Sequence, residues 1–285
     1  MDFTIDAHHH LWRYEPAEYP WIGDSDAVIR RDFLPRDLLS AWEGVGVQGT
    51  VAVQARQTVQ ETEWLLEQAA ENPFLLGVVG WAPLTDPDVA GLLDRFVGNP
   101  RFKGVRHVLQ SESDDYLSRS DFDRGIAAVT ARGLTYDLLI HDRQLRAATA
   151  LADRHPHQRF ILDHLAKPRI REGVLDPWRA DIAALAQRPN VFCKVSGMVT
   201  EADRAAWTIG DLQPFFDTAL EAFGPERLMF GSDWPVCLLA ATPGHWHETV
   251  RALAADLSMD ERASLFGRTA VHAYGLDTGT QPNGV

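Results

Sequence analysis

The chain has 285 residues, of which 45% are hydrophobic, and it carries a formal net charge of −13 at pH 7. A chain of this length can bury one large core, and no shift in composition marks a linker. We therefore expect one domain over residues 1–277, followed by a flexible tail over residues 278–285. The acidic balance opposes binding to nucleic acid or to an anionic membrane, since both attract Lys and Arg.

No apolar run reaches the roughly 18 residues that a membrane span needs. The first residues, Met1-Asp2-Phe3, lack the basic start and apolar stretch of a secretory signal. We expect a soluble, cytoplasmic protein. Its two cysteines, Cys193 and Cys237, are far apart, and reduced core thiols are the expected state. The sequence leaves the oligomeric state open, and a homo-oligomer is compatible with it.

Short apolar, β-branched segments alternate with stretches of helical periodicity. The expected strands cover residues 3–5, 50–53, 75–79, 102–105, 134–140, 159–162, 191–195 and 228–230. The expected helices cover residues 58–72, 89–97, 121–132, 144–155, 178–187 and 212–223. This alternation implies parallel βα units, and eight of them predict an α/β fold, a (β/α)8 TIM-type barrel. A doubly wound sheet is the alternative, but no Gly-x-Gly-x-x-Gly loop follows the first strand.

The first strand ends in the run Ile5-Asp6-Ala7-His8-His9-His10. Side chains alternate along a strand, so His8 and His10 are expected to converge on one point while His9 points away. The run continues into Leu11-Trp12, so we treat it as native rather than as an expression tag. An isolated H-x-H pair is a weak signal, and its meaning depends on what the later strands supply.

The segment after the first strand, residues 12–36, is rich in Pro and aromatic residues and too long for a bare connection. It can fold over the mouth of the barrel and carry Trp12, Tyr19 and Trp21 toward a ligand. It can equally be a surface loop packed on the rim. The sequence leaves both interpretations open.

Polar and ionisable residues follow the predicted strands, where barrels of this kind carry their functional groups. In chain order they are His8, His10, Gln54, Arg56, Trp81, Arg106, His107, His141, Asp163, His164, Lys167, Lys194, Ser196, Ser232, Asp233 and Trp234. Packing explains such a ring poorly, because burying unpaired charges costs several kcal/mol. The sequence therefore predicts a functional site at this end.

Within this ring, His8, His10, His164 and Asp233 form a ligand set suited to one divalent metal ion such as Zn²⁺, with an open position for water. Asp233 could equally be the base that takes a proton from that water. Without a metal, the histidines could donate hydrogen bonds to a carbonyl oxygen and polarise it for attack. The residues alone do not choose between these versions.

Six segments carry a resemblance to a known family: Ile5 to Trp12, Val53-Gln54-Ala55-Arg56, Gly104 to Gln110, Leu162 to Pro168, Cys193 to Gly197, and Phe230 to Pro235. The chain resembles the amidohydrolase superfamily over about Ile5 to Tyr274, and more narrowly its sugar-lactone hydrolases, the L-fuconolactonase group. The resemblance implies an amidohydrolase-like barrel enzyme that opens an aldonolactone with water, such as L-fucono-lactone or a related L-sugar lactone.

The resemblance also implies roles for individual residues. His8 and His10 match the strand-one H-x-H motif, His164 the strand-six histidine, and Asp233 the strand-eight aspartate that acts as general base. Members of this branch differ over whether they hold a catalytic zinc. No strand-five Lys or Glu is evident that could bridge two metals, so a binuclear centre is not expected.

His141 stands near the place where many metal-dependent relatives outside this branch carry a metal ligand. Within the branch we expect no ligand there, and a rim histidine paired with Asp142 is the alternative. A decarboxylase of the same superfamily, which uses a strand-five histidine, would gain if His141 proved to be a ligand. A barrel that only binds a sugar acid is disfavoured by the intact set of three histidines and Asp233.

A polyhydroxylated ring needs directed hydrogen-bond donors and apolar walls. The expected substrate contacts are Gln54, Arg56, Trp81, Arg106, His107, Lys167, Lys194, Trp12 and Trp21. Some of these have a structural alternative. Lys194 can be a buried ion-pair partner inside the barrel, and Arg56 and Arg106 can brace carboxylates across strand ends.

Overall fold

A computed structural model describes residues 3–113 and 115–279 of the chain. Eight parallel strands form one sheet in sequential order: β1 (Thr4–His9), β2 (Val47–Val53), β3 (Leu75–Gly80), β4 (Phe102–His107), β5 (Thr135–Leu138), β6 (Phe160–Leu162), β7 (Val191–Val195) and β8 (Leu228–Phe230). A parallel bridge between His9 and Trp234 brings β1 against the end of β8 and closes the barrel. The predicted (β/α)8 fold is confirmed.

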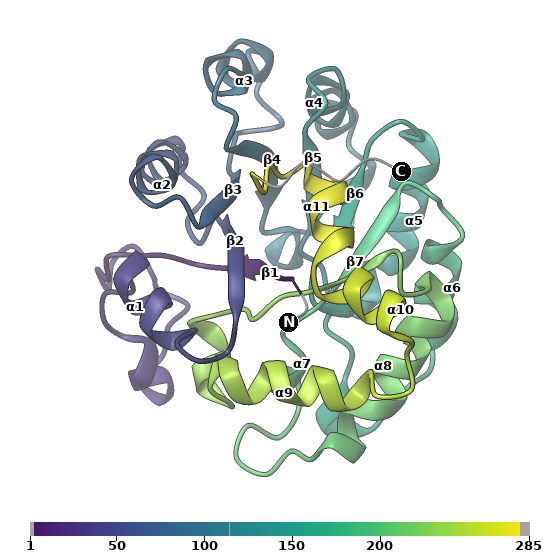
Figure 1. The fold of residues 1–285 in the computed structure, drawn as a ribbon. Helices are drawn as coiled ribbons and strands as arrows, with labels where there is room; N and C mark the ends of the chain where they lie inside the picture. The colour runs from purple at the N-terminus through teal and green to yellow at the C-terminus, as the bar shows by residue number, and fades with distance from the viewer. Residues whose placement is uncertain (1–2, 114, 280–285) are drawn as a thin grey trace.

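The helices surround the barrel (Figure 1): α1 (Pro35–Ala41), α2 (Val59–Glu71), α3 (Val89–Val97), α4 (Ser120–Thr130), α5 (Leu145–Arg154), α6 (Trp178–Ala186), α7 (Met198–Glu201), α8 (Ile209–Phe223), α9 (Pro243–Leu253), α10 (Met259–Ala263) and α11 (Thr269–Tyr274). Short 3-10 turns lie in the loops, and a π-helical turn, Ser264–Arg268, precedes α11. No helix in the described part of the chain is long and apolar enough to cross a membrane.

Each expected helix has a counterpart within a few residues, whereas α1, α7, α9, α10 and α11 were not expected from periodicity. Helices α7, α10 and α11 are too short to show a helical repeat. The expected tail, residues 278–285, falls almost wholly outside the described residues, which end at Gly279.

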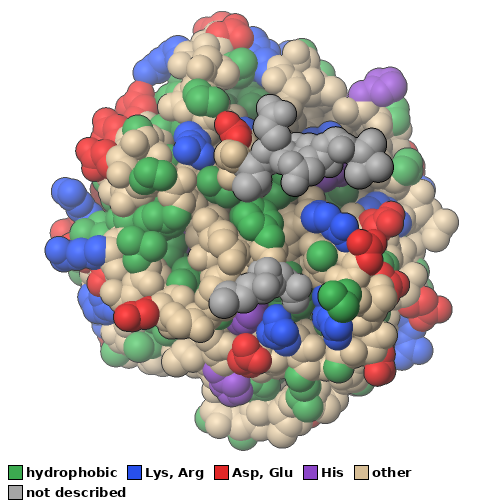
Figure 2. Space-filling model, viewed as in Figure 1, with side chains coloured by type: hydrophobic (Ala, Val, Ile, Leu, Met, Phe, Trp, Pro, Cys, Tyr) green, Lys and Arg blue, Asp and Glu red, His purple; other side chains and the backbone are tan. Residues whose placement is uncertain are grey.

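The last helix closes one end of the barrel. Figure 1 looks onto the end at which β1 begins, and α11 lies across it. Ala270, Ala273 and Tyr274 pack there against apolar residues of several strands, including Ile5 and Met229. In the space-filling view of the same face, acidic and basic side chains are interspersed around the rim (Figure 2). The open end, where a site is expected, is therefore the opposite one.

Two cations hold α11 in place. Lys103 Nζ donates to the carbonyl oxygen of Gly275 at 2.7 Å, and Arg159 Nη1 donates to that of Ala273 at 2.8 Å. These are carbonyls at the C-terminal end of the helix, where the helix dipole favours positive charge. The hydroxyl of Tyr274 reaches into the barrel and donates to Asp137 Oδ2 at 2.7 Å. The closing helix is thus connected to the polar interior described below.

Close packing between α4 and the loop after β3 gives a stability prediction. A Cβ added at Gly125 would lie 2.1 Å from the carbonyl oxygen of Leu84, whereas one added at Gly91 in α3 would meet nothing within 4 Å. We expect Gly125→Ala to lower the free energy of unfolding by about 1–3 kcal/mol through overpacking. Gly91→Ala should raise it by about 0.5–1 kcal/mol, because alanine favours a helix. Urea unfolding of both variants tests this, and a Gly125→Ala protein as stable as Gly91→Ala would contradict it.

Candidate active site

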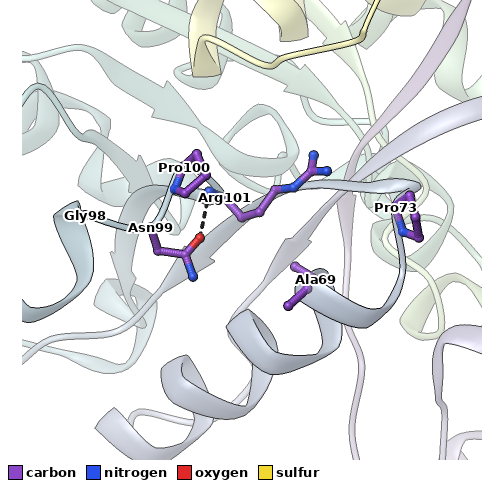
Figure 3. Close-up of a pocket in the computed structure, with 7 residues that line it drawn as sticks. Ala69, Pro73, Gly98, Asn99, Pro100 and Arg101 are labelled. Atoms are coloured by element: carbon purple, nitrogen blue, oxygen red, sulfur yellow. Dashed lines mark hydrogen bonds between the residues drawn. The ribbon is translucent and has the colours of Figure 1, made fainter.

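A pocket of about 230 Å³ opens at the C-terminal ends of the strands. It is lined by His10, Trp21, Ala55, Arg106, Val108, Gln110, Ser111, Leu139, His164, Lys167, Asp233 and Val236. A different hollow, shown in Figure 3, lies where β3 and β4 begin and includes Pro73 and residues 98–101. Among the described residues that line this hollow, Arg101 is the one ionisable residue, so they lack the groups that acid–base or metal chemistry needs.

A β-bulge in β1 aims the two histidines. Asp6 pairs with Thr50 and His9 pairs with Ala52, so β1 contains one more residue than β2 between these two pairs. Ile5 and Ala7 pack into the apolar interior, and unbroken alternation would have placed His9 on their side. Instead His9 Nε2 hydrogen-bonds to Thr50 Oγ1 at 3.0 Å, and His8 and His10 share one side. The bulge therefore re-aims the H-x-H pair toward the pocket.

The carboxylate of Asp6 holds this bulge against the loop after β8. Its Oδ1 accepts hydrogen bonds from the backbone N–H of His8 at 3.1 Å and of Ser232 at 2.8 Å. Its Oδ2 accepts a third from the Ser232 hydroxyl at 2.6 Å. Asp6 is fully buried, and burial raises its pKa to about 7. We name these two side chains the Asp6–Ser232 clamp.

The contact between β1 and the loop after β8, which we call the seam, also positions Asp233. Its backbone N–H donates to the carbonyl oxygen of His8 at 2.7 Å, and its φ of 57° lies in the left-handed region. Its Oδ1 lies 3.4 Å from His10 Nε2, 3.8 Å from His8 Nε2 and 3.9 Å from His164 Nε2. One carboxylate oxygen therefore faces three imidazoles, and an uncommon backbone conformation is retained at this point.

This donor set fits a metal ion. Two groups among the described residues bring metal-ligand atoms close together, His8 with His10 and Asp233, and His8 with Asp163 and His164. His10 Nδ1 donates to the carbonyl oxygen of Val53 at 2.8 Å, which leaves a lone pair on its Nε2. Imidazole nitrogens and a carboxylate suit Zn²⁺ among the divalent ions. The site can hold one metal ion.

Burial sets the charge of these groups. It lowers the pKa of His164 to about 4 and that of His8 well below the usual 6.5, so both imidazoles are neutral at pH 7. Burial alone would raise the pKa of the Asp233 carboxyl, but the electrostatic interaction with His164 and the contact with His10 outweigh burial and hold it below 3.8. At neutral pH the site thus offers the neutral imidazoles of His8 and His164 beside an ionised carboxylate, the protonation states that metal ligation requires.

A layer of buried charges lies directly beneath the histidines. Lys194 Nζ is 2.6 Å from Asp137 Oδ2, 2.9 Å from Asp163 Oδ1 and 3.1 Å from His8 Nδ1. Arg106 Nη1 is 3.0 Å from Asp163 Oδ2. The layer holds two cations and two carboxylates in alternation, which compensates the cost of burying each charge.

Six of the predicted site residues line the pocket itself: His10, Trp21, Arg106, His164, Lys167 and Asp233. Three more lie beneath it, in contact with that lining. His8 contacts Asp233, Gln54 Nε2 donates to the carbonyl oxygen of Arg106 at 3.3 Å, and Lys194 is enclosed in the charged layer. For Lys194 the structure favours the ion-pair alternative over substrate contact.

The long segment after β1 combines both of its expected roles. Trp21 is 48% exposed and lines the pocket, as a residue carried toward a ligand would. Trp12 is fully buried, with its ring stacked on His10 at 6.4 Å between centroids and packed on Tyr19. Trp12 and Tyr19 therefore support the histidine from behind and do not reach the pocket.

Three other predicted contacts lie outside the pocket lining. Arg56 forms an ion pair with Glu18 and thereby braces a carboxylate. Trp81 Nε1 donates to His107 Nδ1 at 3.2 Å, and His107 Nε2 lies 2.7 Å from Glu112 Oε1. The side chains of Arg56, Trp81 and His107 thus all have polar partners within the protein, and the structure gives no support for direct substrate contact by them.

Residues that sequence analysis passed over also belong to the site. Gln110, Ser111, Leu139 and Val236 line the pocket, and Gln110 Oε1 is buried without a hydrogen-bond partner among the described residues. Gln110 stands in a segment that carried the family resemblance, which was its one signal. Asp6 was not singled out because its role depends on a contact with Ser232, distant in the sequence.

His141 is absent from the pocket lining and from both metal-ligand groups found in the described residues. Its backbone N–H donates to Gln144 Oε1 at 2.9 Å at the start of the turn before α5. The decarboxylase alternative depended on this histidine as a ligand, so the structure gives that alternative no support.

With a (β/α)8 barrel and histidines from β1 at its open end, the chain belongs to the amidohydrolase family, whose model matches residues 5–276. It is 42% identical to an L-fucono-1,5-lactonase of Burkholderia multivorans, over 95% of this chain and 96% of that protein. An L-fucono-1,5-lactonase of Burkholderia ambifaria is 36% identical, over 97% of each. The predicted family and branch are confirmed.

A solved structure adds to this comparison. The crystal structure of an amidohydrolase from Burkholderia multivorans with bound zinc superposes with a TM-score of 0.93 at 42% identity. The superposition covers 96% of this chain and the whole of the Burkholderia multivorans chain. The similarity therefore extends over the strands, the loops after them and the closing helices.

The depressed pKa of His164 gives a prediction for the metal-free protein. Its imidazole should remain neutral as the pH falls from 7 and gain a proton only near pH 4, because burial penalises the charged form. Nitrogen-15 NMR of histidine-labelled protein follows this directly. A midpoint near 6.5, the value of an exposed histidine, would contradict the burial argument.

Proposed function

We propose that the protein hydrolyses a sugar lactone, L-fucono-1,5-lactone or a closely related L-sugar lactone. The observation that carries the proposal is the single oxygen of Asp233 that faces three histidine nitrogens at the pocket. The relatives named L-fucono-1,5-lactonase, at 42% and 36% identity, support the substrate class. The cytoplasmic location and the oligomeric state remain predictions.

The dimensions and lining of the pocket support a small polar ring as substrate. A volume of about 230 Å³ suits one sugar ring and is below the usual range for drug-sized ligands. Arg106, Lys167 and Gln110 offer hydrogen-bonding groups, while Trp21 and Leu139 offer apolar surface. This mixture matches a molecule with hydroxyl groups on one side and C–H groups on the other.

We further propose that the site holds one Zn²⁺ ion, with His8, His10, His164 and Asp233 as the residues that would hold it. When bound, the ion would supply Lewis-acid polarisation of the lactone carbonyl and lower the pKa of a water molecule. The zinc in the solved Burkholderia multivorans amidohydrolase supports this choice of metal.

The side chains of this chain account for the proton transfers. Asp233 is ionised at neutral pH and can accept a proton from the attacking water as its oxygen bonds to the carbonyl carbon. When the bond from that carbon to the ring oxygen breaks, the protonated Asp233 can return the proton to the ring oxygen. The product is a hydroxy acid, and Asp233 regains its charge.

Arg106 and Lys167 are the cations of the pocket lining. Lys167 Nζ lies 3.6 Å from Glu201 Oε1, a loose pair that leaves donors available. Arg106 Nε is buried without a hydrogen-bond partner among the described residues. We propose that these two side chains orient the lactone and attract the carboxylate that forms on hydrolysis.

Purified protein should hydrolyse L-fucono-lactone faster than L-rhamnono-, L-galactono- and D-sugar lactones in a pH-indicator assay, with the uncatalysed rate subtracted. Chelation should remove the activity and zinc should restore it. Activity unaffected by chelation would favour polarisation by the histidines alone. The absence of hydrolysis for every lactone would refute the proposal.

Replacing the base tests the assignment of Asp233. Asp233→Asn should lower kcat by about 10²–10⁴-fold, the usual contribution of a general base, because the amide cannot accept the proton. The matched control is Asp142→Asn, which removes a carboxylate at the same end of the barrel but outside the pocket lining. The control should retain activity within a factor of about two. Comparable kcat values for the two variants would rule out Asp233 as the base.

Metal binding tests the ligand set independently of any substrate. The protein should bind one equivalent of Zn²⁺, and His10→Ala should weaken binding by at least about 100-fold, more than the 10–100-fold typical of a group that only supports a ligand. His141→Ala, which removes a half-buried histidine outside both ligand groups, should change affinity less than about threefold. Competition with a chromogenic chelator measures both, and equal effects would contradict the ligand assignment.

A further inference from the structure

His8 faces different partners with its two ring nitrogens. Nδ1 points down into the charged layer, 3.1 Å from Lys194 Nζ and 3.3 Å from Asp163 Oδ1. Nε2 points up to the site, 3.3 Å from His10 Nε2, 3.3 Å from Arg106 Nη1 and 3.8 Å from Asp233 Oδ1. A neutral imidazole carries one proton, so the position of that proton decides which of these contacts become hydrogen bonds.

With the proton on Nε2, His8 donates to the lone pair that His10 Nε2 retains because its Nδ1 donates to Val53. Nδ1 is then an acceptor, and the ammonium of Lys194, which can only donate, satisfies it. In this arrangement the lone pair of His10 Nε2 faces the N–H of His8 Nε2 and not a second lone pair. Arg106 Nη1, which also lies 3.3 Å from His8 Nε2, then keeps Asp163 Oδ2 as its acceptor at 3.0 Å, and we assign this arrangement to the metal-free site.

A metal ion requires the other tautomer, because ligation by Nε2 uses the lone pair of that nitrogen. The proton must then sit on Nδ1, where Lys194 can no longer donate. The acceptor within reach is Asp163 Oδ1, which is buried and has no well-aligned hydrogen bond among the described residues. Lys194 keeps Asp137 as its partner at 2.6 Å.

We propose that metal loading changes the tautomer of His8, and that Asp163 is the positioning residue that accepts the Nδ1 proton in the metal-bound form while Lys194 stabilises the metal-free form. This inference rests on the metal-binding part of the proposed function and not on the identity of the lactone. The proton count of His8 is the same in both forms. Asp163 would therefore control metal affinity without touching the metal.

Zinc affinity of two matched variants tests the role of Asp163. Asp163→Asn and Asp137→Asn each neutralise one fully buried carboxylate that pairs with Lys194; Asp163 also pairs with Arg106, and of the two carboxylates it alone contacts His8. We expect Asp163→Asn to bind zinc at least about 10-fold more weakly than Asp137→Asn, within the range known for carboxylates that support a ligating histidine. Equal affinities would show a general charge effect and overturn the proposal.

Nitrogen-15 NMR of histidine-labelled wild-type protein reads the tautomer itself and does not depend on a variant that folds. The His8 signals, assigned by their loss in His8→Gln, should show the proton on Nε2 without metal and on Nδ1 with one equivalent of zinc. A proton on Nδ1 in both states, or on Nε2 in both, would overturn the proposal. Neither measurement uses a lactone, so a failure of the proposed substrate would leave these outcomes readable.

Discussion

The site depends on how β1 is joined to the end of β8. In the Asp6–Ser232 clamp, the Ser232 hydroxyl donates a hydrogen bond to the Asp6 carboxylate. Beside it, the backbone N–H of Asp233 donates to the carbonyl oxygen of His8 at 2.7 Å. A second backbone bond, from His10 to Trp234, measures 2.6 Å. The seam closes the barrel and, through the same contacts, places two histidines from the first strand opposite the carboxylate from the last. The contacts that close the barrel therefore also assemble the site.

The fold could be predicted because its signals are local. Eight apolar runs separated by helical periodicity define a parallel barrel through side-chain burial within each segment. The closing helix α11 could not be predicted in this way. It is six residues long, and it is stabilised by Lys103 of β4, by Arg159 just before β6 and by the contact of Tyr274 with Asp137. Contacts between segments far apart in sequence leave no periodic trace.

The sequence predicted those site residues that lie together on one strand or within one motif. His8 and His10 followed from spacing, although the alternation argument alone did not reveal the bulge that aims them. Direct contact with substrate was harder to predict for long side chains such as Lys194 and Arg56. A strand end places the Cα of such a residue near the site, but neighbouring carboxylates decide where its charge goes. Those partners lie on other strands.

Crystals soaked in zinc and measured on both sides of the zinc absorption edge would show whether the contact between β1 and the end of β8 builds a metal site for hydrolysis. We expect one strong anomalous peak at bonding distance from the Nε2 atoms of His8 and His10 and next to Asp233. A peak held by other residues, or none at saturating zinc, would contradict it.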